Sequence, residues 1–191
     1  MGRLIAQQIV SIDGFAADAA GRLDFAGDAV WEAIDRETLA WLRGVDRILL
    51  GSRTYGLFAD YWPTAREPLA APINSIPKTV FSSRRTEAPW GEHAAADVEA
   101  GDPVQAVTEM RSSARGDLVL WGSITLFRSL LAAGVIDEVQ LRVVPTVLGA
   151  GTPLFGAPAP LRLLGATPYD CGIVVLRYAP ERPAGEPAPL P

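Results

Sequence analysis

Residues 48–56, ILLGSRTYG, decide the fold class of this chain. The run that ends at Leu50 is short and apolar, which is typical of a strand buried in a sheet. Residues 53–62 follow with the pattern of a short helix that Pro63 closes. A buried strand that passes directly into a helix is the unit of an α/β protein. The junction at 51–54 consists of a glycine, two hydroxyls and an arginine, so it is either a tight turn or a site for an anionic group.

The same alternation continues on both sides of this junction. Strands are predicted at 4–12, 46–50, 77–83 and 117–121, and helices at 29–43, 53–62, 103–114 and 124–134. Further strands are predicted at 137–149, 161–170 and 172–180, the last two as a hairpin, while 63–76 is predicted as a loop and the stretch up to 101 as irregular. This order predicts an α/β fold with a mostly parallel central sheet, helices on both faces and antiparallel C-terminal strands.

Length and composition fit one globular domain. The chain has 191 residues, of which 49% are hydrophobic and 20% charged, and we expect a single domain over 1–179 with a Pro-rich, disordered tail over 180–191. The net charge of -5 and the lack of a Lys/Arg run argue against a nucleic-acid partner. Short, broken apolar stretches argue against a membrane span. A single cysteine, Cys171, and an N-terminus without a signal-peptide pattern indicate a cytoplasmic protein.

The scarcity of histidine and cysteine argues against several kinds of metal site and catalytic site. One His and one Cys cannot build a Cys-rich zinc site, and no metal is expected. A Ser-His-Asp hydrolase would need His93, which lies in a predicted surface link, and no G-x-S-x-G elbow is present. A bound organic cofactor is therefore a better hypothesis than a side-chain nucleophile.

Three predicted strands end alike, in small or hydroxyl residues, and two of these ends also contain arginines. These ends are ILLGSRTY, TVFSSRR and LVLWGSITL. In open α/β sheets ligands bind at the carboxyl edge, where helix N-termini offer free N–H groups to phosphate. Arg53, Arg84 and Arg85 add charge, and an arginine after a strand suits a ribose 2′-phosphate, which favours NADP over NAD.

The alternative interpretation is structural. Taken alone, a Gly-Ser turn before a helix is a common cap, and an arginine at a strand end is commonly solvated. None contains G-x-G-x-x-G or a P-loop. The agreement of three strand ends favours a nucleotide site.

These segments resemble a known family. SIDGFAA (11–17), LLGSRTYGLFADYWP (49–63), WGSITLFRSLL (121–131) and GVIDEVQLRVVPTVLGAGTPLF (134–155) follow the order of dihydrofolate-reductase-like proteins, and the likeness runs from about residue 3 to 178. The chain looks similar to the branch that contains the reductase domain of the bifunctional riboflavin-biosynthesis deaminase–reductase. The zinc-deaminase signature is absent, so we do not expect the bifunctional enzyme itself.

The resemblance implies a three-layer fold, NADPH as cofactor, a small-molecule substrate and a homodimer. It assigns the cofactor phosphates to Gly51, Ser52, Arg53 and Thr54, and the 2′-phosphate to Ser82, Ser83 and Arg84. It places Gly122 and Ser123 under the pyrophosphate and nicotinamide, with Ile124 and Thr125 opening the next helix. It sets Asp13, Gly14 and Ala16 beside the nicotinamide and substrate.

The chain departs from the family pattern at two positions. Trp121-Gly122 stands where many relatives have two glycines joined by a cis peptide, so we expect a differently shaped turn or pocket. Ser52 stands where the wider family often has arginine, which moves the positive charge to Arg53.

The two acidic candidates for the substrate-binding end of the site could also have purely structural roles. Asp35 lies about where folate reductases carry their acid, but its helix also has solvated faces. Asp13 suits the pocket, or else forms an Asx turn. Trp31 and Trp62 are expected to line the pocket, and Trp41 to pack in the core.

Two functions stay open at this point. One is an NADPH-dependent reductase of a pterin-like or aminopyrimidine substrate, similar to 5-amino-6-(5-phosphoribosylamino)uracil reductase or dihydrofolate reductase. The other is a non-catalytic nucleotide sensor or dimeric interaction module on the same fold. Trp121, and the lack of an unambiguous acid, favour this second function.

Overall fold

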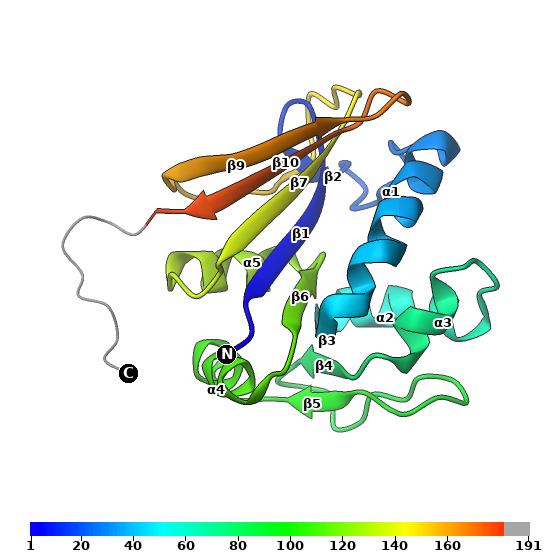
Figure 1. Cartoon of the computed structure of the whole chain (residues 1–191), viewed down its shortest axis with the longest axis vertical. Helices are drawn as coiled ribbons and strands as arrows, with labels where there is room; N and C mark the ends of the chain where they lie inside the picture. The colour runs from blue at the N-terminus through cyan, green and yellow to red at the C-terminus, as the bar shows by residue number, and fades with distance from the viewer. Residues whose placement is uncertain (182–191) are drawn as a thin grey trace.

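An eight-stranded sheet forms the centre of the molecule in a computed structural model that describes residues 1–181 (Figure 1). Its strands lie in the order β5-β4-β3-β6-β1-β7-β10-β9. Their bounds are β1 Leu4–Ser11, β3 Val45–Gly51, β4 Lys78–Phe81, β5 Asp97–Glu99, β6 Asp117–Trp121, β7 Glu138–Val144, β9 Leu161–Pro168 and β10 Val174–Pro180. A second, two-stranded sheet pairs β2 (Phe15–Ala17) with β8 (Thr152–Pro153).

The pairing is parallel from β5 to β7 and antiparallel beyond it. β1 lies between β6 and β7 and pairs in parallel with both. β10 pairs antiparallel with β7 and with β9. The predicted fold class, a mostly parallel sheet with antiparallel C-terminal strands, is therefore confirmed, as is the hairpin formed by the last two strands.

Helices cover both faces of the sheet and give three layers (Figure 1). They are α1 Asp28–Trp41, α2 Ser52–Tyr61, α3 Ala70–Ser75, α4 Pro103–Ser113 and α5 Ile124–Ala132, with short 3-10 turns at Leu42–Gly44 and Trp62–Thr64. One face packs Val107 of α4 and Phe127 of α5 into the main core cluster, and the other packs Tyr55 of α2 and Ile73 of α3 into a second. Strand β6 serves both clusters, because Leu118 and Val119 point to opposite faces.

Two short elements lie where loops or irregular chain were expected. Helix α3 occupies 70–75 within the expected loop at 63–76, and β5 occupies 97–99 within the irregular stretch. Ala70 and Ile73 are buried, so tertiary packing forms this six-residue helix despite Pro72. Strand β7 ends at Val144 instead of 149, directly before Pro145, which has no N–H for a sheet ladder.

The last strand extends one residue beyond 179, where the domain was expected to end. Pro180 closes β10, and residues 182–191 of the predicted tail lie outside the described residues. Within residues 1–181, no helix is both long and apolar enough to cross a bilayer. The same part of the chain holds no group of three or more His, Cys, Asp or Glu side chains that could bind a metal ion.

Candidate functional site

The carboxyl ends of three parallel strands lie side by side. Gly51, the last residue of β3, is paired with Phe81 at the end of β4. On the other side, Leu49 of β3 is paired with Leu120 of β6, so the two strands reach the same edge together. The three similar strand ends of the sequence therefore meet at one place, which is the edge where open α/β sheets bind ligands.

A cleft of about 1410 Å³ opens at this edge. That volume exceeds the roughly 300–1,000 Å³ of a typical small-molecule pocket, so it has room for two molecules side by side. The predicted residues that line it are Ala16, Trp31, Asp35, Gly51, Ser52, Arg53, Thr54, Trp62, Ser82, Ser83, Gly122, Ser123, Ile124 and Thr125. Asp13, Gly14 and Arg84 are the predicted site residues that do not line it.

The first turns of α2 and α5 are joined at the centre of the cleft. The backbone N–H of Ser123 donates to Thr54 Oγ1 at 3.0 Å, and the N–H of Gly51 donates to Ser123 Oγ at 2.6 Å. The Ser123 hydroxyl also lies 3.1 Å from Thr54 Oγ1. Gly122 and Ser123 both have left-handed backbone, with φ of 55° at each. This turn places the N-terminus of α5 next to the N-terminus of α2.

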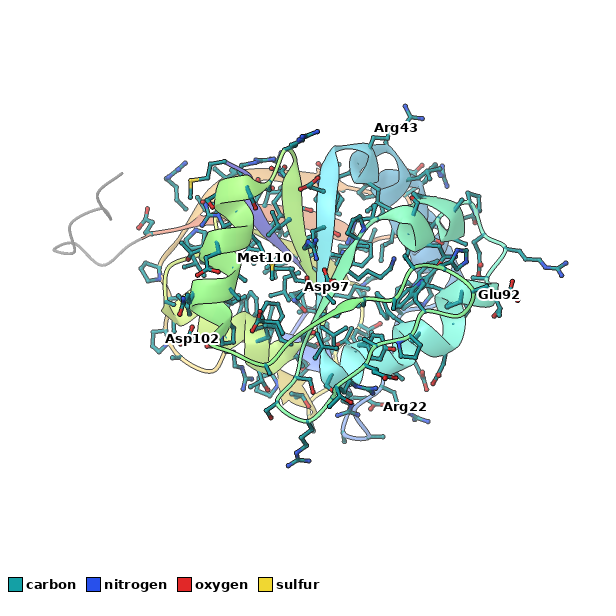
Figure 2. All side chains as sticks on the ribbon, turned by 90° about the horizontal axis from the view of Figure 1, so that it is seen from below. Arg22, Arg43, Glu92, Asp97, Asp102 and Met110 are labelled. Carbon is teal, nitrogen blue, oxygen red and sulfur yellow. The ribbon has the colours of Figure 1, made fainter. Side chains whose placement is uncertain are left out.

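Neither of these helices has a side-chain cap. Gly51 and Ser123 hold the N-cap positions of α2 and α5, and neither residue makes a side-chain hydrogen bond to the first N–H groups of its own helix. By contrast, the carboxylate of Asp102 caps α4, accepting from the N–H of Val104 and of Gln105 (Figure 2). The first N–H groups of α2 and α5 are therefore available to an anion, and the helix dipoles favour one there.

Arginines surround the start of α2. Arg53 lines the cleft, and its guanidinium donates to the carbonyl of Gly21 at 3.3 Å, which ties the loop after β2 to the helix. Arg85 donates to Ser52 Oγ at 2.9 Å and stacks over the ring of Tyr55. Arg84 is exposed beside Ser83, and its guanidinium has no hydrogen bond or ion pair with the part of the chain that the structure describes.

Asp13 serves to hold two loops together. Its carboxylate accepts hydrogen bonds from Ser11 Oγ at 2.7 Å and from the backbone N–H groups of Leu148 and Gly149. The hydrogen bond from Ser11, assisted by those from the backbone, lowers the pKa of Asp13 to about 2. The Asp13 carboxylate thus joins the turn after β1 to the loop at 148–149, and Asp13 does not line the cleft.

Two carboxylates line the end of the cleft between α1 and α2, which we call the α1–α2 end. Asp35 comes from α1, and Glu67 from the segment between the second 3-10 turn and α3. Burial, and then the negative charge of Glu67, raise the pKa of Asp35, while Arg142 of β7 opposes the shift. The Tyr61 hydroxyl donates to Glu67 Oε1.

Trp121 forms a wall of the cleft. Only 8% of it is exposed, because its ring packs 6.0 Å from that of Phe58 and its indole N–H donates to Gln7 Oε1 at 2.7 Å. No cis peptide bond occurs within residues 1–181, so the peptide between Trp121 and Gly122 is trans. Trp31 and Trp62 are half-buried and line the cleft as predicted.

Several lining residues were missed by sequence reasoning. Gln8 of β1 donates to the carbonyl of Gly122 at 2.8 Å and so fixes the turn before α5. Arg142 is buried in β7, where Gln7 and Thr38 accept from its guanidinium. Polar residues inside apolar strands are a signal that could have found these two. Glu67 lies in a Pro-rich stretch without any pattern, and nothing in the sequence marks it.

This chain is similar to known proteins over most of its length. The family model described as the RibD C-terminal domain matches residues 3–175. The uncharacterized protein YyaP of Bacillus subtilis (strain 168) is 26% identical over 186 residues, which cover 92% of this chain and 94% of that protein.

Solved structures agree on the fold. A protein from Shewanella sp. PV-4 that is named for riboflavin biosynthesis superposes with a TM-score of 0.76 and 22% identity, covering 94% of this chain and 99% of that one. Dihydrofolate reductase from Enterococcus faecalis, in complex with NADP(H) and RAB-propyl, superposes with a TM-score of 0.64 and 14% identity, covering 95% of this chain and 98% of that one. At these identities the likeness concerns the fold, and it confirms the dihydrofolate-reductase-like architecture.

Proposed function

The chain belongs to the RibD C-terminal domain family, and from this premise we propose that it is an NADPH-dependent reductase of a small nitrogen heterocycle, of the pterin or aminopyrimidine kind. The proposal rests above all on one observation: the N-termini of α2 and α5 lie in the same cleft, and neither has a side-chain cap. Thr54 and Ser123 join the starts of α2 and α5, so their free N–H groups converge on one place. A pyrophosphate is an anion of the right kind for such a place.

The residues around this point suit a dinucleotide. Ser52, Arg53 and Thr54 would hold one phosphate at the start of α2, and Ser123 with Thr125 would hold the other at the start of α5. Ser82, Ser83 and the uncommitted guanidinium of Arg84 would hold a 2′-phosphate at the end of β4. This last group is the reason for proposing NADPH over NADH. The dihydrofolate reductase of similar fold is in complex with NADP(H), which supports the choice of NADPH over NADH.

The α1–α2 end would hold the substrate. It is walled by Trp31 and Trp62 and contains the carboxyl of Asp35. When bound, the reduced nicotinamide supplies the hydride. The protein side of the reaction is then to orient the substrate, to exclude water with the aromatic walls, and to provide a proton from Asp35 to a ring nitrogen.

A turnover assay tests this proposal. The protein is incubated with NADPH and a panel of dihydropterins, aminopyrimidines and flavin precursors, and the loss of reduced-nicotinamide absorbance is followed. The proposal expects oxidation of NADPH with at least one heterocycle, and loss of that activity in Asp35→Asn. Saturable NADPH binding without turnover across the panel would instead favour the alternative function, a non-catalytic nucleotide sensor or interaction module.

We also propose that the protein forms a homodimer. Strand β9 is the edge of the sheet, and its Leu163 and Leu164 are exposed. An open edge with apolar side chains is suited to pairing with a second copy. Sedimentation equilibrium should give twice the chain mass, and Leu163→Glu should shift it toward the monomer. Val147→Glu, at an exposed loop residue, is the matched control. A monomeric wild type would overturn the proposal.

A further inference from the structure

Aromatic rings in contact with one another form a wall of the cleft, from the end of β6 to the α1–α2 end. The ring centroid of Phe58 lies 6.0 Å from that of Trp121 and 6.2 Å from that of Trp62. The ring of Tyr61 meets that of Trp62 edge-on, with 5.1 Å between the centroids. All four residues line the cleft. This aromatic wall offers a planar heterocycle an apolar surface on which to stack.

Carboxylates line the cleft beside this wall. Asp35 of α1 and Glu67 both belong to the lining of the α1–α2 end. The Tyr61 hydroxyl donates to Oε1 of Glu67, so Glu67 is held directly against the aromatic wall. Oε2 of Glu67 is buried and has no hydrogen-bond partner among residues 1–181. A molecule bound at this end therefore meets a carboxylate as well as an aromatic surface.

The arginine whose charge acts on Asp35 is directed into the protein. Arg142 of β7 is buried, and its guanidinium donates to Gln7 Oε1 at 3.0 Å and to Thr38 Oγ1 at 2.8 Å. One guanidinium faces two carboxyl groups here. Among the described residues that line it, the α1–α2 end therefore has no net positive charge, whether the Asp35 carboxyl is protonated or ionised.

The other arginines of the cleft lining also have partners. Arg22, in the loop after β2, lies 3.4 Å from Asp18 and 3.2 Å from Asp24, so two carboxylates share one guanidinium. Arg128 of α5 donates to two backbone carbonyls in and directly after β8. Arg53 lies at the start of α2, where a cofactor phosphate is proposed. The positive charge of the cleft is thus directed to its cofactor end or to groups of the protein.

We propose that the substrate is an unphosphorylated aromatic heterocycle, neutral or cationic, that stacks on the aromatic wall, and that Glu67 is a specificity-determining residue that rejects the phosphorylated form of the same ring. The inference rests on the proposed function, because it names the class of substrate for that reductase. A phosphoryl group carries about two negative charges at neutral pH. Placing it near the Glu67 carboxylate in a partly buried site costs binding free energy, and such repulsion is a common source of specificity.

The test compares ring compounds that differ only in a phosphate. The pairs are riboflavin with riboflavin 5′-phosphate and neopterin with neopterin 3′-phosphate, and their binding to the full chain is measured by equilibrium dialysis. An excess of inorganic pyrophosphate is present throughout, so that the N-termini of α2 and α5 do not capture the phosphate of the probe. In each pair that binds, the unphosphorylated compound should bind about tenfold more tightly. If neither unphosphorylated ring binds, or if a phosphorylated ring binds as tightly as its partner, the inference is overturned.

Two variants separate the effect of charge from that of the ring surface. Glu67→Gln should narrow the difference within a pair by about threefold or more, through tighter binding of the phosphorylated compound. Glu92→Gln removes the same charge at an exposed residue outside the cleft lining, and it should leave the difference unchanged. Trp62→Leu should weaken both members of a pair equally, by about fivefold or more, because it removes stacking surface.

Each variant can also contradict the inference. An unchanged difference in Glu67→Gln would reject the role of Glu67, and unchanged affinities in Trp62→Leu would reject the stacking surface. If Glu67→Gln does not fold, the wild type decides. Added NaCl screens a repulsion, so the difference within a pair should narrow as the salt concentration rises, and a difference that is independent of salt would overturn the inference.

The outcomes separate this inference from the proposed function. A preference for the unphosphorylated rings, without oxidation of NADPH by any of them, would uphold the ring site and reject the reductase. Oxidation of NADPH that is faster with a phosphorylated ring than with its unphosphorylated partner would uphold the reductase and overturn the inference.

Discussion

At the scale of single residues, the cleft depends on one turn of left-handed backbone. Gly122 and Ser123 reverse the chain between β6 and α5, and this reversal brings the Ser123 N–H to Thr54. A Cβ at Gly122 would lie 2.9 Å from Thr54 Oγ1 and 3.0 Å from its Cγ2. Glycine is therefore needed here for its conformation and also for its lack of volume.

Gly122→Ala should lower the free energy of unfolding by more than the cost of placing alanine at a positive φ, because the new Cβ would also collide with Thr54. Gly134→Ala is the matched control, because Gly134 also has positive φ but has no atom near its missing Cβ. We expect Gly134→Ala to cost about 1 kcal/mol and Gly122→Ala about 2–4 kcal/mol in urea unfolding. Equal losses in the two variants would show that contact with Thr54 is unimportant.

Arg84 gives a second prediction for a single residue. Arg84→Ala should weaken NADPH binding about tenfold, or about 1.4 kcal/mol, by removing a charged hydrogen bond to the 2′-phosphate. NADH binding should be nearly unchanged, since NADH lacks that phosphate. Arg43→Ala, at an exposed arginine on the opposite side of the molecule from the cleft loop at Arg22 (Figure 2), serves as control. A parallel loss for both cofactors in Arg84→Ala would reject the 2′-phosphate assignment.

Asp13 should show its structural role at acid pH. The pKa of Asp13 in the folded protein, about 2, lies below its ordinary value of 3.8, so its ionised form stabilises the fold above pH 3.8. That stabilisation should disappear as the pH falls from about 4 toward 2. In Asp13→Asn the stability measured by urea unfolding should be lower at pH 5 and should lack this part of the acid dependence. Asp170→Asn, at an exposed turn, is the control and should show the same pH dependence of stability as wild type. If Asp13→Asn also showed the wild-type pH dependence, the structural role of Asp13 would be contradicted.

At the scale of elements, the junction of α3 and β4 contains an unusual cation. Lys78, the chain's single lysine, is buried at the first residue of β4, where it donates to the carbonyls of Asn74 and Ile76 and lies 4.5 Å from the ring centroid of Trp90. These contacts tie the end of α3 to the sheet. Burial lowers the pKa of Lys78 to about 8 from 10.5.

Lys78 should make the stability rise with pH in an alkaline window. Between pH 8 and 10.5 the unfolded chain keeps the Lys78 proton while the folded protein has lost it, so folding becomes more favourable as pH increases. Below pH 8 both states are protonated and this dependence vanishes. In urea unfolding at pH 7–10.5, wild type should gain stability relative to Lys78→Met only within that window. A constant difference between the two proteins would disprove the shift.

Prediction from sequence succeeded where a local pattern determines an element. The strand ends at Gly51 and Trp121 were identifiable because apolar runs stop at glycine and serine. Helix α3 and strand β5 were not, because a six-residue helix with a proline and a three-residue strand form only through packing against Trp90 and β4. The same reason explains Asp13, whose partners at 148–149 are distant in sequence, and Glu67, which reaches the cleft through the fold alone.

At the scale of the whole molecule, the sheet order brings distant segments to one cleft. β6 inserts between β3 and β1, so the turn after residue 121 lies beside the turn after residue 51. α1 and α2 lie on the same face of the sheet (Figure 1), and residues of both helices line one end of the cleft. This arrangement gives one end suited to phosphates and another with carboxyls and aromatic walls, as a two-substrate reductase requires.

Isothermal titration of the wild-type protein with NADPH and with NADH tests the central claim most directly. The account predicts one saturable NADPH site per chain in the micromolar range, NADH binding at least tenfold weaker, and loss of both in Ser52→Glu, which places a negative charge at the start of α2. Absence of saturable NADPH binding at millimolar cofactor, or equal affinity for the two nucleotides, would contradict it.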